Sequence, residues 1–239
     1  MATEQYLEIR KYITDNITKV YPNLQLHNNV PFYEDVPYMM EQTSTTIKHL
    51  IVGLNDFDYF EKKITSRGYQ CTLELTQIEE ILIPLENKYL ASNPSIINRR
   101  TISFNNFTDS KKNEVWNSFK KYADVDLATN PEVLDALCDH YIEVIGKHFI
   151  PFWEKYSDLQ YINDEIIDKA PDIYNYLDGM YGFKKLIIMR ICKNKNYEQH
   201  KAHLINLKEK ALEKDREGNA AYWNLFAEMV QIIESKYVF

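Results

Sequence analysis

Glycine scarcity constrains this chain more than any other feature of its sequence. Only 6 of its 239 residues are glycine, whereas about 7% is usual in soluble proteins. Loops that cradle phosphate groups or dinucleotides need glycines, because only there can the backbone approach the ligand closely. The chain contains neither a G-x-G-x-x-G nor a G-x-x-x-x-G-K-[ST] pattern, and no other catalytic signature replaces them. We therefore expect no bound cofactor.

The composition is that of an ordinary globular protein, with 45% hydrophobic and 26% charged residues. A chain of this length fits one large domain or two small ones. We expect a single continuous body over residues 1–239, made of an α+β subdomain (1–107) and a helical subdomain (108–239). The predicted fold class is α+β and mostly helical, with a small sheet in the amino-terminal half and stacked amphipathic helices in the carboxyl-terminal half.

The amino-terminal half shows both of the periodicities that distinguish helices from strands. The patterns predict helices at residues 4–20, 57–64 and 76–85, the second of them short. They predict strands at 43–54, 69–75 and 100–104, and a loop at 22–37. Gly68 is placed to end the short helix. Thr76 and Glu79 have the spacing of a capping box, and Pro84 is expected to kink or end the helix that follows.

From residue 108 onward, apolar residues recur at helical spacing only. One stripe contains Val115, Trp116, Phe119 and Tyr122. Asn130-Pro131 is typical of a helix start, Pro151 is expected to close that helix, and Gly218 to separate the last two helices. The carboxyl-terminal half is therefore predicted to be all helix.

Cysteine and histidine residues do not form a recognisable metal site. Cys71, Cys138 and Cys192 lie far apart, so we expect reduced, buried thiols in a cytoplasmic protein. His140 with Glu143, and His200 with His203, supply at most two ligands each, whereas metal sites need three or four. We interpret both pairs as helix side chains and predict that the protein binds no metal.

The sequence also argues against two kinds of partner. The amino terminus lacks the charged and apolar regions of a signal peptide, and no apolar run approaches 18 residues, so no membrane association is expected. The net charge of −7 disfavours nucleic-acid binding, which needs a basic face against phosphate.

Charge is distributed unevenly in the carboxyl-terminal half. Residues 124–178 contain 13 acidic and 3 basic residues, a local charge of −10, whereas residues 184–217 contain 10 basic and 5 acidic residues, a local charge of +5. The two segments either compensate each other or leave an acidic face that attracts a basic protein. The predicted partner-binding face combines carboxylates and the aromatic run 149–156, at Asp135, Asp139, Glu143, Phe152, Trp153 and Tyr156.

Three short stretches resemble uncharacterised bacterial families that include immunity proteins of polymorphic toxins. They are HFIPFWEKYSDL at 148–159, GFKKLII at 182–188 and NYE at 196–198. The similarity covers about residues 140–205 and names no catalytic residue. It implies a bacterial protein that neutralises a toxin by binding it.

These observations predict a non-enzymatic protein-binding protein, an immunity-type inhibitor that holds a basic toxin or nuclease on an acidic helical face. Two alternatives stay open at this point. One is a hydrolase-type enzyme that uses dispersed carboxylates or histidines, which only the fold can bring together. The other is a helical scaffold or adaptor. The sequence does not set the oligomeric state.

Overall fold

The computed structural model describes residues 4–27, 36–55, 63–90, 100–104, 110–169 and 176–238. The chain divides into two compact units. Unit 1 comprises residues 1–73 and 103–155, and unit 2 comprises residues 74–102 and 156–239. Each unit draws on both halves of the chain, so the boundary expected at residue 107 is not the boundary between them.

The fold class is α+β, as the sequence predicts. Five strands form one antiparallel sheet in sequence order, namely β1 (Gln25–Leu26), β2 (Tyr38–Gln42), β3 (Thr46–Asn55), β4 (Thr65–Leu75) and β5 (Ile102–Ser103). Strands β3, β4 and β5 confirm the three predicted strands. Strand β2 follows the predicted loop and pairs with β3 so that Met39 faces Leu50, and both side chains are buried.

The short helix predicted at 57–64 falls mostly on residues 56–62, which lie outside the described residues. The prediction that Gly68 ends this helix is wrong. Gly68 does not follow a helix but lies inside β4, with a φ of 79°. The same left-handed conformation that glycine adopts at a helix end is used here within a strand, and the sequence cannot distinguish the two uses.

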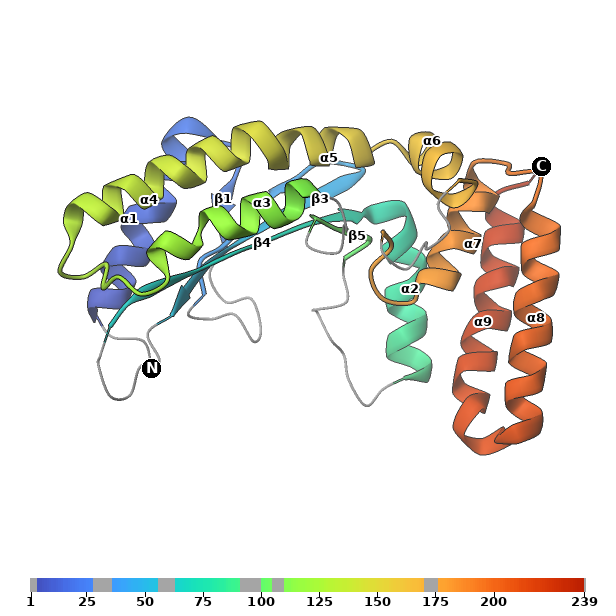
Figure 1. Ribbon diagram of the computed structural model, residues 1–239. Helices are drawn as coiled ribbons and strands as arrows, with labels where there is room; N and C mark the ends of the chain where they lie inside the picture. Colours follow the sequence, from blue (N-terminus) through green and yellow to red (C-terminus); the bar gives the residue numbers. More distant parts are fainter. Residues whose placement is uncertain are drawn as a thin grey trace. The chain divides into compact units, whose positions relative to one another are not determined.

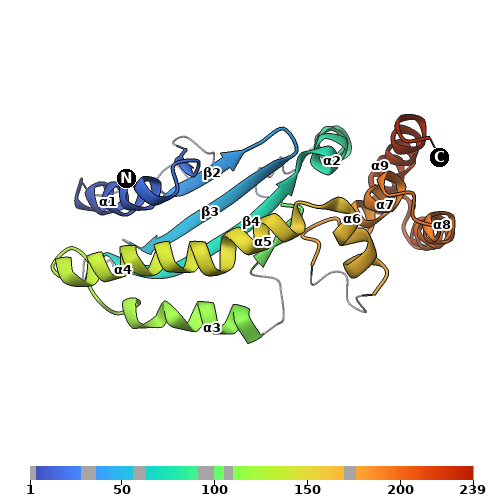
Figure 2. The same cartoon turned by 90° about the horizontal axis from the view of Figure 1, so that it is seen from above.

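Helices cover the sheet in unit 1 (Figures 1 and 2). They are α1 (Glu4–Val20), α3 (Ser110–Ser118), α4 (Pro131–Val144) and α5 (Ile150–Tyr156), and Figure 2 shows α4 and α5 as one long rod that runs along the sheet. Helix α1 buries an apolar stripe that includes Ile9, Ile13 and Ile17, while α4 buries Leu137 and Tyr141. The unit therefore has the layered helix-on-sheet core that amphipathic helices and half-buried strands favour.

Pro151 does not close the helix that begins at Pro131, contrary to the prediction. A π-helical turn, η4 (Ile145–Phe149), joins α4 to α5, and the N–H of Ile150 bonds to the carbonyl of Ile145. Proline lacks an N–H and its ring clashes with the carbonyl four residues earlier in a regular α-helix. The wider turn directly before Pro151 changes that hydrogen-bond pattern, so the rod continues through the proline.

Unit 2 is built from helices α2 (Thr76–Tyr89), α6 (Leu159–Tyr161), α7 (Tyr181–Ile191), α8 (Tyr197–Lys214) and α9 (Arg216–Lys236), with a π-helical segment η5 (Ile162–Ile167) after α6. Helix α2 continues past Pro84 to Tyr89. Helix α9 packs against α2, α7 and α8. The carboxyl-terminal part of the chain holds helices alone in its described portion, as predicted.

The break between α8 and α9 lies at Asp215, three residues before the predicted position. The Asp215 side chain caps α9 by accepting a hydrogen bond from the N–H of Gly218. Gly218 thus belongs to the first turn of the new helix and does not end the old one. Among the described helices, none combines the length and apolar character needed to cross a bilayer.

A buried ion pair stabilises unit 2. The Nζ atom of Lys184 lies 2.9 Å from Glu79 Oε1, and both side chains are 2% exposed. Thr101 donates a hydrogen bond of 2.7 Å to the same carboxylate oxygen, and Lys184 donates one to the carbonyl of Arg100. Glu79 is therefore not the partner of a capping box, and the α2 cap has no side-chain hydrogen bond.

We expect Lys184→Met to destabilise the chain by about 3–5 kcal/mol, because it leaves the Glu79 carboxylate buried without its counter-charge. Urea unfolding followed by circular dichroism measures the change. The control is Lys88→Met, which breaks the pair with Glu228, where the side chains are 55% and 31% exposed. That change should cost far less, because solvent screens an exposed pair. Equal losses in the two variants would contradict this account of the buried pair.

Candidate functional site

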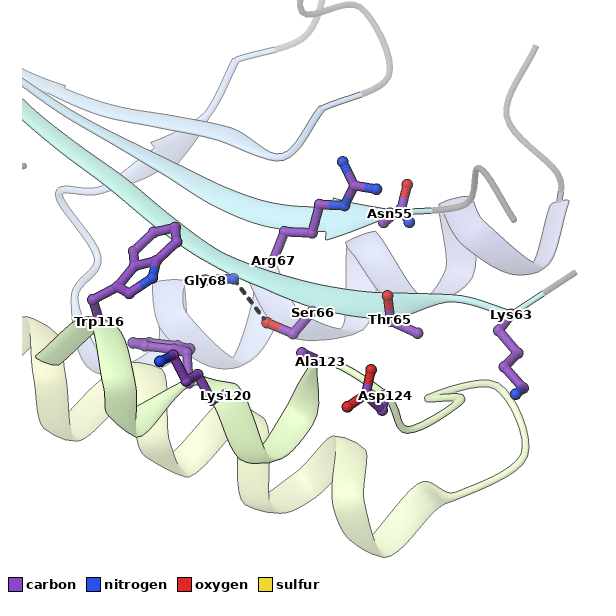
Figure 3. A pocket seen from close by; sticks show the side chains of 11 residues that line it. Asn55, Lys63, Thr65, Ser66, Arg67, Gly68, Trp116, Lys120, Ala123 and Asp124 are labelled. Carbon is purple, nitrogen blue, oxygen red and sulfur yellow. Dashed lines mark hydrogen bonds between the residues drawn. The ribbon is translucent and has the colours of Figure 1, made fainter. Parts of the chain in front are cut away.

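A pocket of about 480 Å³ opens in unit 1 beside strand β4 (Figure 3). Its walls come from the end of β3, the first residues of β4, helix α3 and the 3-10 turn η3 (Lys120–Tyr122) that follows. The lining residues are Asn55, Lys63, Thr65, Ser66, Arg67, Gly68, Trp116, Phe119, Lys120, Ala123 and Asp124. Two regions far apart in sequence therefore build one concave site, which sequence reasoning did not find.

Gly68 determines the shape of this site. Its φ of 79° lies in the left-handed region, and a Cβ atom there would lie 3.2 Å from the Trp116 ring. A Cβ on Gly53 would lie 2.8 Å from the Gly68 carbonyl oxygen. The absence of both Cβ atoms allows β3 and β4 to approach closely and allows the indole of Trp116 to lie against β4.

Helix α4 is attached to β4 at the same place. The buried hydroxyl of Tyr141 donates a hydrogen bond to the Gly68 carbonyl, and burial raises the pKa of this phenol well above its ordinary value. We call these four residues, Gly53, Gly68, Trp116 and Tyr141, the Gly68 junction. It joins two strands and two helices, so the position of the pocket wall depends on it.

The Trp116 side chain is 44% exposed, although the sequence places it on an apolar stripe. The other members of that stripe, Val115, Phe119 and Tyr122, are buried as predicted. The indole packs edge-on against the ring of Tyr69, with 6.0 Å between the ring centroids. Trp116 is therefore held in place by the Gly68 junction while a large part of its ring stays open to solvent beside the pocket.

Basic side chains dominate the charge of the pocket. Among the described residues, Lys63, Arg67 and Lys120 line it, against one carboxylate, that of Asp124. Figure 3 shows Lys120 and Asp124 on the α3 side of β4, Arg67 on the other side of the strand, and Lys63 at the far end. Arg67 and Lys120 are exposed and form no ion pair within the described part of the chain.

The predicted acidic residues lie elsewhere in unit 1, on the exposed side of α4. Asp135 accepts a hydrogen bond of 2.6 Å from the hydroxyl of Tyr12 on α1, and Glu143 forms an ion pair of 2.6 Å with Lys147. Asp139 is exposed and has no hydrogen-bond or ion-pair partner among the residues that the structure describes. The structure thus places the three carboxylates on one helix, with Tyr12 beside them.

The aromatic part of the predicted face is not on the surface. Phe152, Trp153 and Tyr156 are only 5%, 1% and 8% exposed. The indole of Trp153 donates a hydrogen bond of 3.0 Å to the Thr72 carbonyl, and Phe152 packs edge-on against Phe104. These rings belong to the core because the rod turns its apolar side inward, so we correct their placement and no longer assign them to the binding face.

Several acidic residues of the segment 124–178 have structural partners. Asp126 accepts a hydrogen bond from the N–H of Ile64, Asp158 caps α6, and Asp168 accepts from Asn194. In the basic segment 184–217, Lys184 pairs with Glu79, and Lys201 pairs with Glu198 and Glu234. These glutamates lie outside the acidic segment. In the described ranges, no ion pair joins the acidic segment to the basic one.

The histidine that the sequence singles out on α4 contacts a hydroxyl group. His140 Nε2 lies 2.7 Å from Ser118 Oγ, but the Ser118 hydroxyl also donates to the Val115 carbonyl at 2.7 Å. Burial and Lys121 lower the pKa of His140. Glu143, which would orient the imidazole in a catalytic triad, is paired with Lys147. The contact is therefore best described as a hydrogen bond between α3 and α4.

The thiols are poor nucleophiles. Burial raises the pKa of Cys71, raises that of Cys138 to about 12 and raises that of the half-buried Cys192 to about 11. A thiol must lose its proton to react or to bind a metal. Among the described residues, no group of three His, Cys, Asp or Glu side chains is arranged to hold a metal ion.

Comparisons of the chain with protein-family models, curated proteins and solved structures find no match. The similarity of residues 140–205 to families with toxin-immunity members stays a prediction.

In unit 2, His200 lies beside a second pocket of about 360 Å³, with Asp168, Lys185 and His203. Burial is the main reason why the pKa of His200 falls to about 4, and the nearby Lys185 lowers it further. The imidazole is therefore neutral in the folded chain at neutral pH. Its Nε2 atom is buried without a hydrogen-bond partner among the described residues.

We expect Gly68→Ala to destabilise the chain by about 1–3 kcal/mol, because an alanine is strained at this φ and also crowds Trp116. Gly179→Ala is the matched control, since Gly179 also has a positive φ of 47° but nothing lies within 4 Å of its Cβ position. Urea unfolding measures both losses, and the Gly68 variant should lose more. A smaller loss for Gly68→Ala than for Gly179→Ala would show that Trp116 is not packed against this glycine.

We also expect the stability of the chain to fall as the pH drops from 6.5 toward 4, in part through His200. In that range the unfolded chain binds a proton that folded His200 rejects, so lowering the pH favours unfolding. His200→Leu should flatten this part of the stability profile, measured as the urea midpoint at several pH values. His203→Leu is the control. An unchanged profile in His200→Leu would mean that His200 carries no such linkage.

Proposed function

We propose that this chain is a non-enzymatic protein-binding protein that holds a basic partner on the α1–α4 face of unit 1. The α1–α4 face comprises Tyr12, Glu132, Asp135 and Asp139. The observation that carries the proposal is the hydrogen bond between Tyr12 and Asp135, because it places a ring that is 44% exposed among exposed carboxylates. Tyrosine is one of the residues that dominate interface energetics.

The two helices form a defined surface. Besides the Tyr12–Asp135 bond, the hydroxyl of Tyr21, the residue directly after α1, donates a hydrogen bond of 2.9 Å to the Ile142 carbonyl on α4. Bonds at both ends of the contact fix the register of α1 against α4, so the exposed side chains keep their relative positions. A preformed surface binds with less loss of conformational entropy than a mobile one.

The charge of the face indicates the chemistry of the partner. Glu132 and Asp139 are exposed and have no ion-pair partner in the described parts of the chain, so their field reaches solvent. Such a field speeds association with a basic protein and weakens as salt rises. A basic toxin or nuclease, the partner expected from the sequence, fits this chemistry.

A photo-reactive residue tests where the partner binds. We expect a photo-reactive phenylalanine at position 12 to cross-link one basic protein from the source organism. The control replaces Tyr222, a tyrosine of unit 2 that is 41% exposed, with the same photo-reactive phenylalanine. This control should not cross-link the basic protein. Cross-linking from position 222 alone would contradict the proposal.

Charge reversal tests how the partner binds. We expect Asp135→Lys with Asp139→Lys to slow association with the purified cross-linked protein by about tenfold or more at low salt, because electrostatic steering contributes that much. The control pair is Glu213→Lys with Glu217→Lys, which makes the same change in net charge on unit 2. Association rates that fall equally in both pairs would contradict a role for the α1–α4 face.

A further inference from the structure

We propose that the pocket beside Trp116 binds a small aromatic anion, a planar ring that carries a carboxylate or a phosphate. The proposal concerns the pocket of Figure 3 and is independent of the α1–α4 face. It rests on the charge of the pocket, on the exposed indole and on the size of the cavity.

The charge of the pocket is opposite to that of the whole chain. The chain carries −7, yet the described residues that line the pocket include Lys63, Arg67 and Lys120 and one carboxylate, Asp124. Arg67 and Lys120 are exposed, and neither has an ion-pair partner within the described ranges. Unpaired cations around a concavity favour a ligand that brings its own negative charge.

The indole supplies a surface for a ring. Trp116 keeps 44% of its side chain exposed, which leaves apolar area in water that a ligand would cover. The ring is held against Gly68 and Tyr69, so it does not have to be ordered when a ligand binds. Planar rings stack well on such a fixed aromatic side chain.

Size and arrangement agree with a small molecule. A volume of about 480 Å³ is within the range of ordinary ligand pockets. Lys120 follows Trp116 by four residues, and both side chains line the pocket. A ring that stacks on Trp116 can therefore place its anionic group near Lys120.

The chain offers a direct test with defined probes. Adenosine 5′-monophosphate and benzoate carry both a ring and a negative charge, adenosine carries the ring alone, and inorganic phosphate carries the charge alone. Titration of the full chain, followed by calorimetry and by the NMR signals of the indole N–H groups, measures binding. We expect one or both aromatic anions to bind and to shift the Trp116 signal, at least about tenfold more tightly than either adenosine or phosphate. Which of the two binds distinguishes phosphate from carboxylate as the anionic group.

Variants then locate the site. We expect Trp116→Ala to weaken binding by about tenfold or more, as loss of a stacked aromatic ring does. Lys120→Ala should weaken it several-fold and reduce its salt dependence, whereas the control Lys121→Ala, an exposed neighbour that does not line the pocket, should leave it unchanged. Because Lys120 is exposed, its variant reports on binding even if Trp116→Ala fails to fold.

Three results would overturn the proposal. They are no binding of either aromatic anion at millimolar concentration, binding of adenosine as tight as that of the aromatic anions, and binding that Lys120→Ala and Lys121→Ala change equally.

Discussion

The contact between Tyr141 and Gly68 is the constraint on which unit 1 depends. A buried phenol from α4 reaches the carbonyl of a strand residue whose backbone is left-handed. The hydrogen bond fixes the long helical rod on the sheet at the point where Gly53 of β3 leaves room for the Gly68 carbonyl of β4. Because Trp116 lies against the same glycine, one local conformation positions a helix, a strand pair and the wall of a pocket.

Unit 2 is stabilised in a different way. Its helices surround the Glu79–Lys184 pair, which is almost completely buried and further bonded to Thr101 and to the carbonyl of Arg100. Removal of either partner of such a pair is costly, because it leaves the other charge buried without a counter-charge. Unit 1 therefore carries the exposed features to which we assign binding, namely the α1–α4 face and the pocket beside Trp116. The roles assigned to unit 2 in this account are structural ones.

The sequence predicts the elements better than the sites. Alternating Tyr69, Cys71, Leu73 and Leu75 correctly indicate a strand by their period-two spacing, although Thr72 and Glu74 between them are buried as well. The start of β4 at Thr65 was missed, since a left-handed glycine looks the same in a strand as at a helix end. The aromatic run at Phe152 and Trp153 was misplaced for another reason. Aromatic residues fill cores and interfaces alike, and only the sheet beneath α5 decides between them.

The pocket had no local signal in the sequence. Arg67 and Lys120 line the same pocket although they lie on different elements. Trp116 sits on a short helix whose weak apolar stripe gives no sign that the indole stays open. An exposed tryptophan beside a glycine with positive φ becomes visible only when strand and helix are placed in space. The acidic residues of α4 were easier to find, because exposed charges follow the polar side of an amphipathic helix.

The central claim is that the Gly68 junction acts as one cooperative structure. A double-mutant cycle between Tyr141→Phe and Gly68→Ala tests it, with the free energy of unfolding as the measured quantity. If the left-handed backbone at Gly68 presents its carbonyl to Tyr141, the backbone shift that a strained alanine causes also moves the acceptor. The double variant should then lose less stability than the sum of the losses of the two single variants. The difference, the coupling free energy, should be about 1 kcal/mol or more. Additive losses, with coupling below about 0.3 kcal/mol, would contradict the claim.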